Sequence, residues 1–155
     1  MIWEELNPSL IFTNVEAATS DDVMKFVGGA LTREGYTKDS YVNALIEREA
    51  EYPTGLDIEG IGVAIPHTPV THVYKSGTAI AVLSNPVPFV QMGTDDEYTD
   101  VRLVFMLSVV DPNQHIDELQ QIIAIIQDKD VLERLLAAKT PSEIIDLIKE
   151  KESTL

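Results

Sequence analysis

The chain of 155 residues contains no cysteine, which excludes disulfide bonds and thiol catalysis. Long hydrophobic runs are missing as well, because no apolar stretch approaches the roughly 20 residues that a membrane-spanning helix needs. The N-terminal stretch MIWEELNPSL is acidic and lacks the positively charged start of a signal peptide. Together these absences predict a cytoplasmic protein that is not inserted directly into the membrane.

Basic residues are scarce: the chain has 11 Lys and Arg against 26 Asp and Glu, and its formal net charge is −15. A surface of this sign repels the phosphate backbone of nucleic acids, so we expect no nucleic-acid partner. The same charge favours association with a basic protein surface. The alternative is that the acidity serves only solubility, and composition by itself does not separate the two.

Common signatures of catalysis and nucleotide binding are absent too. The sequence has no G-x-x-x-x-G-K-[ST], G-x-G-x-x-G, H-E-x-x-H or G-x-S-x-G pattern, so it gives no support to a nucleotide-dependent enzyme or a common hydrolase. His67 and His72 flank Pro69 in a His-x4-His arrangement, which is not a recognised zinc-ligand spacing. We therefore expect no metal and no cofactor, and we interpret His72 as a structural or supporting residue.

What the sequence does contain is an alternation of strand and helix patterns. Asn85-Pro86 interrupts an apolar strand pattern, and a helical pattern is expected to end before Pro53. The elements expected in the first two thirds are strands at 9–12, 78–83 and 87–92, a helix opened by residues 20–22 and ended by Gly35, and a helix from Thr37 to about Glu51.

Residues 101–110, VRLVFMLSVV, are apolar at both odd and even positions apart from Arg102 and Ser108, as in a strand buried on both faces. The last third predicts three helices, one of them started by Thr140-Pro141-Ser142-Glu143, and the tail at 150–155 is expected to fray. No repeat or linker interrupts residues 1–155. The predicted fold class is therefore α/β, with a mixed β-sheet and helices packed on both sides in a single domain.

The stretch GVAIPHT ends an apolar strand pattern on a proline and a histidine. Pro66 stiffens the backbone before His67, and side chains at strand ends in α/β proteins often line a ligand crevice. A neutral imidazole held there can act as a nucleophile through its free lone pair, with the Thr68 hydroxyl orienting the ring. The alternative is a loop histidine that makes a structural hydrogen bond.

Two further residues suit an anionic group. His115 follows Asp111-Pro112 in the first turn of a predicted helix, where backbone N–H groups and the helix dipole favour an anion and a neutral imidazole. It also follows the long central strand, so it is expected at the same sheet edge as His67. Arg48 is suited to bidentate phosphate contacts. Taken singly, His115 also fits a solvent-exposed helix residue, and Arg48 fits an ion pair within its helix or a solvated charge.

Together these features resemble the enzyme IIA domain of the bacterial phosphoenolpyruvate-dependent sugar phosphotransferase system, in its fructose–mannitol class and most of all its galactitol-type members. The resemblance extends from about Leu10 to Ile148. It rests on GVAIPHT, on the Arg-Glu pair in the upstream REAEYPTG, on VLSNPVPF before DDEYTDVRLVFMLSV, and on the histidine that opens the next helix.

The resemblance implies a site and a set of partners. His67 matches the histidine that takes the phosphoryl group from the phosphocarrier protein HPr and passes it to an enzyme IIB. His115 matches a second histidine that stabilises the phosphorylated state, and Arg48 matches an arginine that balances the phosphate charge. Thr54 matches a nearby hydroxyl position. No metal, nucleotide or other cofactor is implied, and association with a membrane IIC component is indirect.

Two matters stay open at the level of sequence. Galactitol-type members need not keep the second histidine, whereas this chain has His115, so the transported sugar or sugar alcohol is undetermined. The role is open too: a regulatory relative, whose phosphorylation state controls another protein, uses the same histidine chemistry. A non-catalytic binding module that keeps only the fold is less favoured, because His67, His115 and Arg48 occur together.

Overall fold

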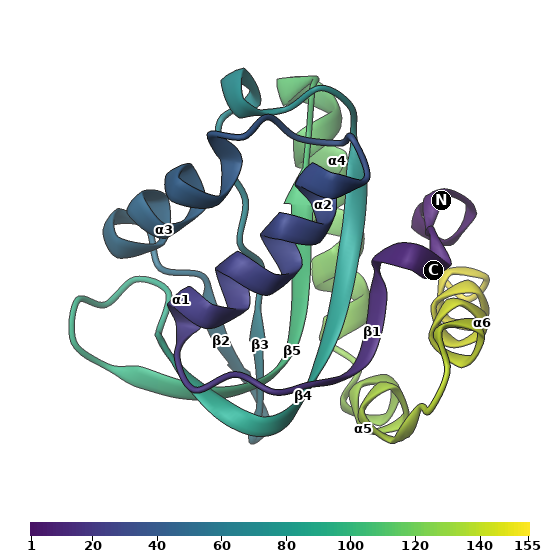
Figure 1. Ribbon diagram of the computed structural model, residues 1–155. Helices are drawn as coiled ribbons and strands as arrows, with labels where there is room; N and C mark the ends of the chain where they lie inside the picture. The colour runs from purple at the N-terminus through teal and green to yellow at the C-terminus, as the bar shows by residue number, and fades with distance from the viewer.

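The computed structural model describes all 155 residues and contains one five-stranded sheet. The strand order is β1-β4-β5-β3-β2, with β1–β4 and β3–β5 parallel and the other two pairs antiparallel. This mixed sheet confirms the predicted α/β class (Figure 1). The strands are β1 (Ile11–Val15), β2 (Gly55–Ile58), β3 (Ile61–Ala64), β4 (Gly77–Val90) and β5 (Tyr98–Ser108).

Helices cover both faces of the sheet (Figure 1). One face carries α3 (Tyr41–Glu51) and a continuous rod made of α1 (Ser20–Val23), a π-helical segment (Met24–Gly28) and α2 (Gly29–Arg33). The other carries α4 (Pro112–Ile126), α5 (Lys129–Ala137) and α6 (Pro141–Glu152). Short 3-10 turns lie at Ile2–Glu5, Pro8–Leu10 and Val70–His72. No helix has the length and apolar character needed to cross a membrane.

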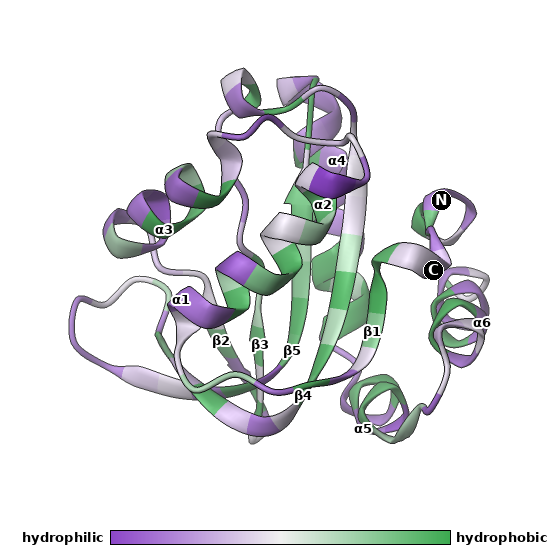
Figure 2. Ribbon diagram, in the orientation of Figure 1, coloured by the Kyte–Doolittle hydropathy of each residue, from purple (hydrophilic) through white to green (hydrophobic).

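The sheet separates two hydrophobic cores, and β5 contributes to both. Leu103, Phe105 and Leu107 pack toward α4–α6, whereas Val104 and Met106 pack toward the α1–α3 layer. The alternation follows from the two-residue period of a strand. The prediction that this segment lies buried at the centre of the sheet is therefore confirmed, and Figure 2 shows the apolar stretches of β3, β4 and β5 in the middle of the molecule.

Two predicted element starts need correction. The first strand begins at Ile11 and not at residue 9, because Pro8–Leu10 forms a 3-10 turn capped by the Asn7 side chain. The helix expected from Thr37 begins at Tyr41. Thr37 instead forms an isolated antiparallel bridge with Val73, so its backbone is used by a neighbouring segment before the helix starts.

The strand break predicted at Asn85-Pro86 is not found in the structure. β4 runs through these residues without ending, and the only consequence is a shift in its register against β5 between Val82 and Val87. A proline is tolerated there because the irregular pairing does not require its missing N–H group. One long strand therefore replaces the two shorter ones that the sequence indicated.

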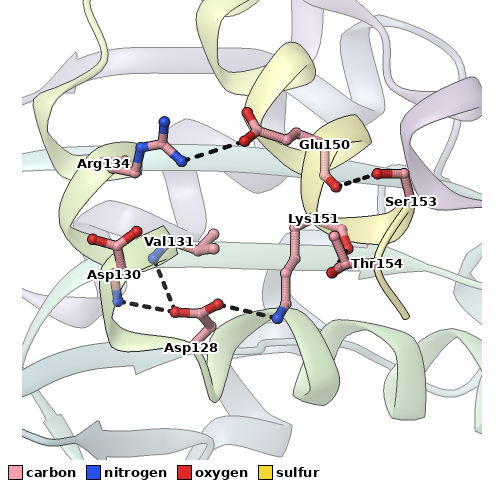
Figure 3. A network of polar contacts seen from close by, with 8 residues as sticks. All are labelled: Asp128, Asp130, Val131, Arg134, Glu150, Lys151, Ser153 and Thr154. Atoms are coloured by element: carbon pink, nitrogen blue, oxygen red, sulfur yellow. Dashed lines mark hydrogen bonds and ion pairs between the residues drawn. The ribbon is translucent and has the colours of Figure 1, made fainter.

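The C-terminal helices are joined by charged side chains (Figure 3). Lys151 Nζ on α6 lies 3.0 Å from Asp128 Oδ2 at the start of α5, and Arg134 Nη1 lies 3.7 Å from Glu150 Oε1. The predicted start of α6 is confirmed, since the Thr140 hydroxyl accepts the hydrogen bond of the Glu143 N–H group.

The tail expected to fray at 150–155 is helical as far as Glu152. The Glu152 side chain is buried and accepts hydrogen bonds from the backbone N–H groups of Ile2 (3.0 Å) and Trp3 (2.8 Å) and from Gln121 Nε2 (2.8 Å). These contacts join the two ends of the chain, which lie side by side in Figure 1. A contact between residues so distant in the sequence leaves no local pattern, and for that reason it was not predicted.

Candidate functional site

His67 follows β3, in a segment fixed by hydrogen bonds on both sides. The Leu107 N–H group of β5 donates to the Pro66 carbonyl (3.0 Å), and the Ile65 N–H group donates to Thr54 Oγ1 (3.3 Å). His67 Nδ1 lies 2.9 Å from the Ile65 carbonyl oxygen. Because a carbonyl oxygen only accepts, Nδ1 carries the ring proton, and the lone pair of the neutral ring is left on Nε2.

His115 lies beside it. β3 and β5 are parallel, so their carboxyl ends reach the same edge of the sheet, and α4 begins shortly after β5 with Asp111 as its cap. The ring centroids of His67 and His115 are 4.8 Å apart, and the rings are tilted by 49°. This confirms the expected shared edge. The buried His115 Nδ1 has no hydrogen-bond partner, so nothing in the protein satisfies that atom.

Both histidines are held in the neutral state. Burial is the main reason that the pKa of His67 lies below its ordinary value. The hydrogen bond to Ile65 opposes this effect, whereas the Arg48 charge and the charge that His115 would carry if protonated lower the pKa further. The pKa of His115 is lowered by burial and then by Arg48. At neutral pH the pair therefore offers lone pairs rather than positive charge.

Arg48 is near the end of α3 and supplies the nearby fixed cation. Its guanidinium lies over the Tyr52 ring at 4.9 Å from the ring centroid, and no carboxylate lies within ion-pair distance of it. The ion pair within the helix that the sequence left open is therefore not formed. The charge of Arg48 lowers the pKa of both histidines, although its side chain lines a cavity with Pro69 and His72 and not the one that contains His67. A guanidinium without a carboxylate partner suits an incoming anion.

Thr54 and His67 line the same cavity of about 380 Å³, together with the exposed side chains of Tyr52 and Met92. The Thr54 hydroxyl is not free, however: it donates to Glu49 Oε1 (2.6 Å), and the Thr54 N–H group donates to Glu49 Oε2 (2.7 Å). The structure thus brings Thr54 to the site but commits its hydroxyl proton to Glu49. Sequence reasoning noted Glu49 only as part of the Arg-Glu pair and as a neighbouring charge.

His72 is not part of the His67–His115 pair. Its Nδ1 lies 2.9 Å from the Ser40 hydroxyl, and its carbonyl accepts the Lys38 N–H hydrogen bond (2.9 Å). It therefore connects the loop after His67 to the start of α3, as its structural interpretation suggested. No group of three or more His, Cys, Asp or Glu side chains is arranged to hold a metal ion.

Two neutral imidazoles lie together at the carboxyl ends of β3 and β5, and the Arg48 charge on α3 acts on both. Such a set of groups suits a small anionic ligand. Comparison with known proteins shows the family of the chain. The family model described as "Phosphoenolpyruvate-dependent sugar phosphotransferase system, EIIA 2" matches residues 4–151, so the chain belongs to this family.

The chain is also similar in sequence and structure to individual proteins. The galactitol-specific EIIA component of Escherichia coli K12 is 34% identical over 115 residues, which is 74% of this chain and 76% of that protein. A solved complex of enzyme IIAMTL and phosphorylated enzyme IIBMTL from Escherichia coli is similar at 28% identity and a TM-score of 0.78, covering 94% of this chain and 97% of that one. The nitrogen regulatory protein IIA-Ntr of Neisseria meningitidis reaches a TM-score of 0.79 at 26% identity, covering 95% and 98%.

Proposed function

We propose that this protein is a phosphoryl carrier of a sugar phosphotransferase system, acting as one IIA domain in the cytoplasm. It accepts a phosphoryl group from HPr on His67 and passes it to an enzyme IIB. The observation that carries the proposal is the neutral His67 ring, whose Nδ1–H donates to Ile65 and whose Nε2 is left with the lone pair beside His115. A nucleophile in this state needs no general base to activate it.

The transfer exchanges one P–N bond for another. Nε2 of His67 attacks the phosphorus of the donor phosphohistidine, the donor P–N bond breaks, and its electron pair returns to the donor imidazole. The Nδ1 proton of His67 stays hydrogen-bonded to the Ile65 carbonyl, so the phosphorylated ring is cationic. A cationic ring is a good leaving group, which suits a carrier that must give up the phosphoryl group again.

The remaining residues stabilise charge. Phosphoryl transfer through a loose transition state depends on positioning and electrostatics more than on acid–base catalysis. We assign Arg48 to the phosphoryl oxygens and His115 to a hydrogen bond that it donates to them. Thr54 does not contact the phosphoryl group, because its hydroxyl already donates to Glu49. It instead supports the segment that carries His67.

The partners follow from the surface and the relatives. Tyr52 and Met92 are exposed apolar side chains on the cavity that contains His67, and the chain carries a net charge of −15. Apolar contacts within an acidic surface suit basic partner proteins that associate quickly and in a salt-dependent way. We assign HPr and an enzyme IIB to this surface. The IIAMTL–IIBMTL complex supports the assignment of an enzyme IIB as a partner. Association with IIC is indirect, through that enzyme IIB.

The similarity to a galactitol-specific EIIA component supports a role in sugar or sugar-alcohol uptake, with galactitol as the first substrate to test. A regulatory role is the second candidate, and the likeness to IIA-Ntr favours it. The two differ in the fate of the phosphoryl group. Transfer to a purified IIB supports uptake, whereas a phosphorylated protein that donates to no IIB supports regulation.

Labelling with phosphoenolpyruvate, enzyme I and HPr tests the proposal. We expect one acid-labile phosphate per chain, lost in His67→Ala and kept in His72→Ala. Label that survives His67→Ala would overturn the assignment. His115→Ala should still accept phosphate but transfer it to IIB about tenfold more slowly, because one hydrogen bond to the transition state is lost. Unchanged transfer would remove His115 from the site.

A further inference from the structure

Hydrogen bonds and the covalent backbone of Ile65 together link α3 to the ring of His67. Glu49 accepts both donors of Thr54, the hydroxyl at 2.6 Å and the backbone N–H group at 2.7 Å. Thr54 Oγ1 in turn accepts the Ile65 N–H group at 3.3 Å. The Ile65 carbonyl accepts the Nδ1–H group of His67 at 2.9 Å. Each donor and acceptor in this linkage is used by its neighbour.

The linkage lies where regular strand pairing ends. The antiparallel ladder of β2 and β3 closes with Gly55 opposite Ala64, so the next N–H group, that of Ile65, has no strand partner. The Thr54 hydroxyl takes the place of that partner. A hydroxyl rotates freely unless its proton is held, and Glu49 holds it. The Thr54 lone pair is thereby directed at the backbone that orients His67.

The position of Glu49 is unfavourable for a carboxylate in two respects. It is in the last turn of α3, where the helix dipole is negative. It is also partly buried, and burial raises its pKa despite the opposing hydrogen bonds from Thr54. Residues that break a local rule of this kind often do so at functional sites.

We propose that Glu49 is a positioning residue for phosphoryl transfer, which acts through Thr54 and the Ile65 backbone to hold His67 in its Nδ1–H tautomer with Nε2 free to react. The inference rests on the proposed role of His67 as the phosphoryl acceptor. It assigns Glu49, which makes no hydrogen bond to His67 and does not line the cavity that contains it, a part in the reaction separate from that of the adjacent Arg48.

Ring-nitrogen NMR on protein with 15N-labelled histidine tests this directly, because the 15N shifts report which nitrogen is protonated. We expect the neutral wild-type His67 to be Nδ1-protonated. Thr54→Val and Glu49→Ala should raise the Nε2–H fraction and slow phosphoryl acceptance about tenfold. Thr54→Ser, which keeps the hydroxyl, should restore both values. Glu49→Gln, which keeps one acceptor oxygen, should be intermediate.

The matched control is Glu47→Gln, which removes the same charge from the same helix at an exposed position without touching Thr54. Its tautomer ratio and rate should equal those of the wild type. A wild-type tautomer ratio and rate in folded Thr54→Val and Glu49→Ala would overturn the proposal, and so would equal effects of Glu47→Gln and Glu49→Gln. If Thr54→Val does not fold, Glu49→Ala and the comparison of Glu49→Gln with Glu47→Gln decide.

The same experiment separates this inference from the proposed function. If the wild type takes no phosphate from HPr, the proposed function fails, and the effect on the reaction fails with it. The tautomer ratio is measured without phosphate, so it still decides whether Glu49 and Thr54 set the protonation of His67. If the wild type is phosphorylated but the variants keep its tautomer ratio and rate, only the positioning role is lost.

Discussion

The C-terminal helices pair most of their cations with carboxylates, although Lys149 lies over the Trp3 ring, whereas the cation at the histidine site has no carboxylate partner. In the C-terminal helices, the cations Lys129, Lys151 and Arg134 each lie within ion-pair distance of a carboxylate, two of them in Figure 3. At the histidine site, Arg48 has no such partner and lies over an aromatic ring, while the neighbouring Glu49 bonds to Thr54.

Under the proposed function, charge that contributes to structure in the C-terminal helices differs from charge that is available to a ligand at Arg48. A carboxylate next to Arg48 would compete with an incoming phosphoryl group for the same guanidinium. The protein avoids that competition by occupying Glu49 with two donors of Thr54. The C-terminal helices have no such constraint, and their exposed pairs contribute little to stability because water screens them. Substitutions in the two regions should therefore have different consequences.

The largest expected effect comes from removing the unpaired cation. Arg48→Gln should slow phosphoryl transfer about 100-fold, since it removes the positive charge that faces the developing phosphoryl charge. Arg134→Gln, the matched change in the C-terminal helices, should leave the rate within twofold of the wild type. Rapid-quench measurement with labelled HPr gives both rates. Equal losses in the two variants would mean that only net charge matters, and the distinction between the regions would fail.

The next largest effect is on stability and not on transfer. Glu152→Ala leaves the N–H groups of Ile2 and Trp3 without their acceptor, and the former is buried, so it should cost about 2 kcal/mol of unfolding free energy. Arg134→Ala, which breaks an exposed pair, should change that free energy by less than about 1 kcal/mol. Urea denaturation measures both. Phosphoryl acceptance by Glu152→Ala at 20 °C should be unchanged, and a reduced rate would show that the two regions are coupled.

Local signals account for much of what the sequence predicted. The Thr140 cap, the end of the first helical rod at Gly35 and the doubly buried β5 each depend on residues close together in the chain. His67 and His115 were expected to meet because both follow strands of one sheet, and the topology brings them together.

The contacts that were missed involve residues whose partners no periodicity reveals. Glu152 bonds to the backbone at the opposite end of the chain, and Glu49 bonds to Thr54 across the turn before β2. In the sequence both are ordinary helical acids among several others. Thr54 was matched only to a nearby hydroxyl position, because the acceptor that takes its proton is visible only in three dimensions.

The smallest expected effects are on the pKa values of Asp128 and His67. Both pKa values are lowered, but for different physical reasons. The pKa of Asp128 is lowered mainly by its hydrogen bond to Lys151, which favours the charged carboxylate. The pKa of His67 is lowered mainly by burial, which disfavours the charged ring. In both cases the unfolded chain binds the proton more readily, so acidification destabilises the fold, below about pH 6.5 for His67 and below about pH 3.9 for Asp128.

NMR titration of single variants distinguishes the two causes. Lys151→Met should return the Asp128 pKa most of the way to its ordinary value, because the pairing partner is gone. Arg48→Gln should raise the His67 pKa only part of the way, because burial remains the larger cause and the His115 contribution also persists. Complete recovery of the His67 pKa in Arg48→Gln would mean that the site is governed by charge, as the C-terminal helices are, and not by desolvation.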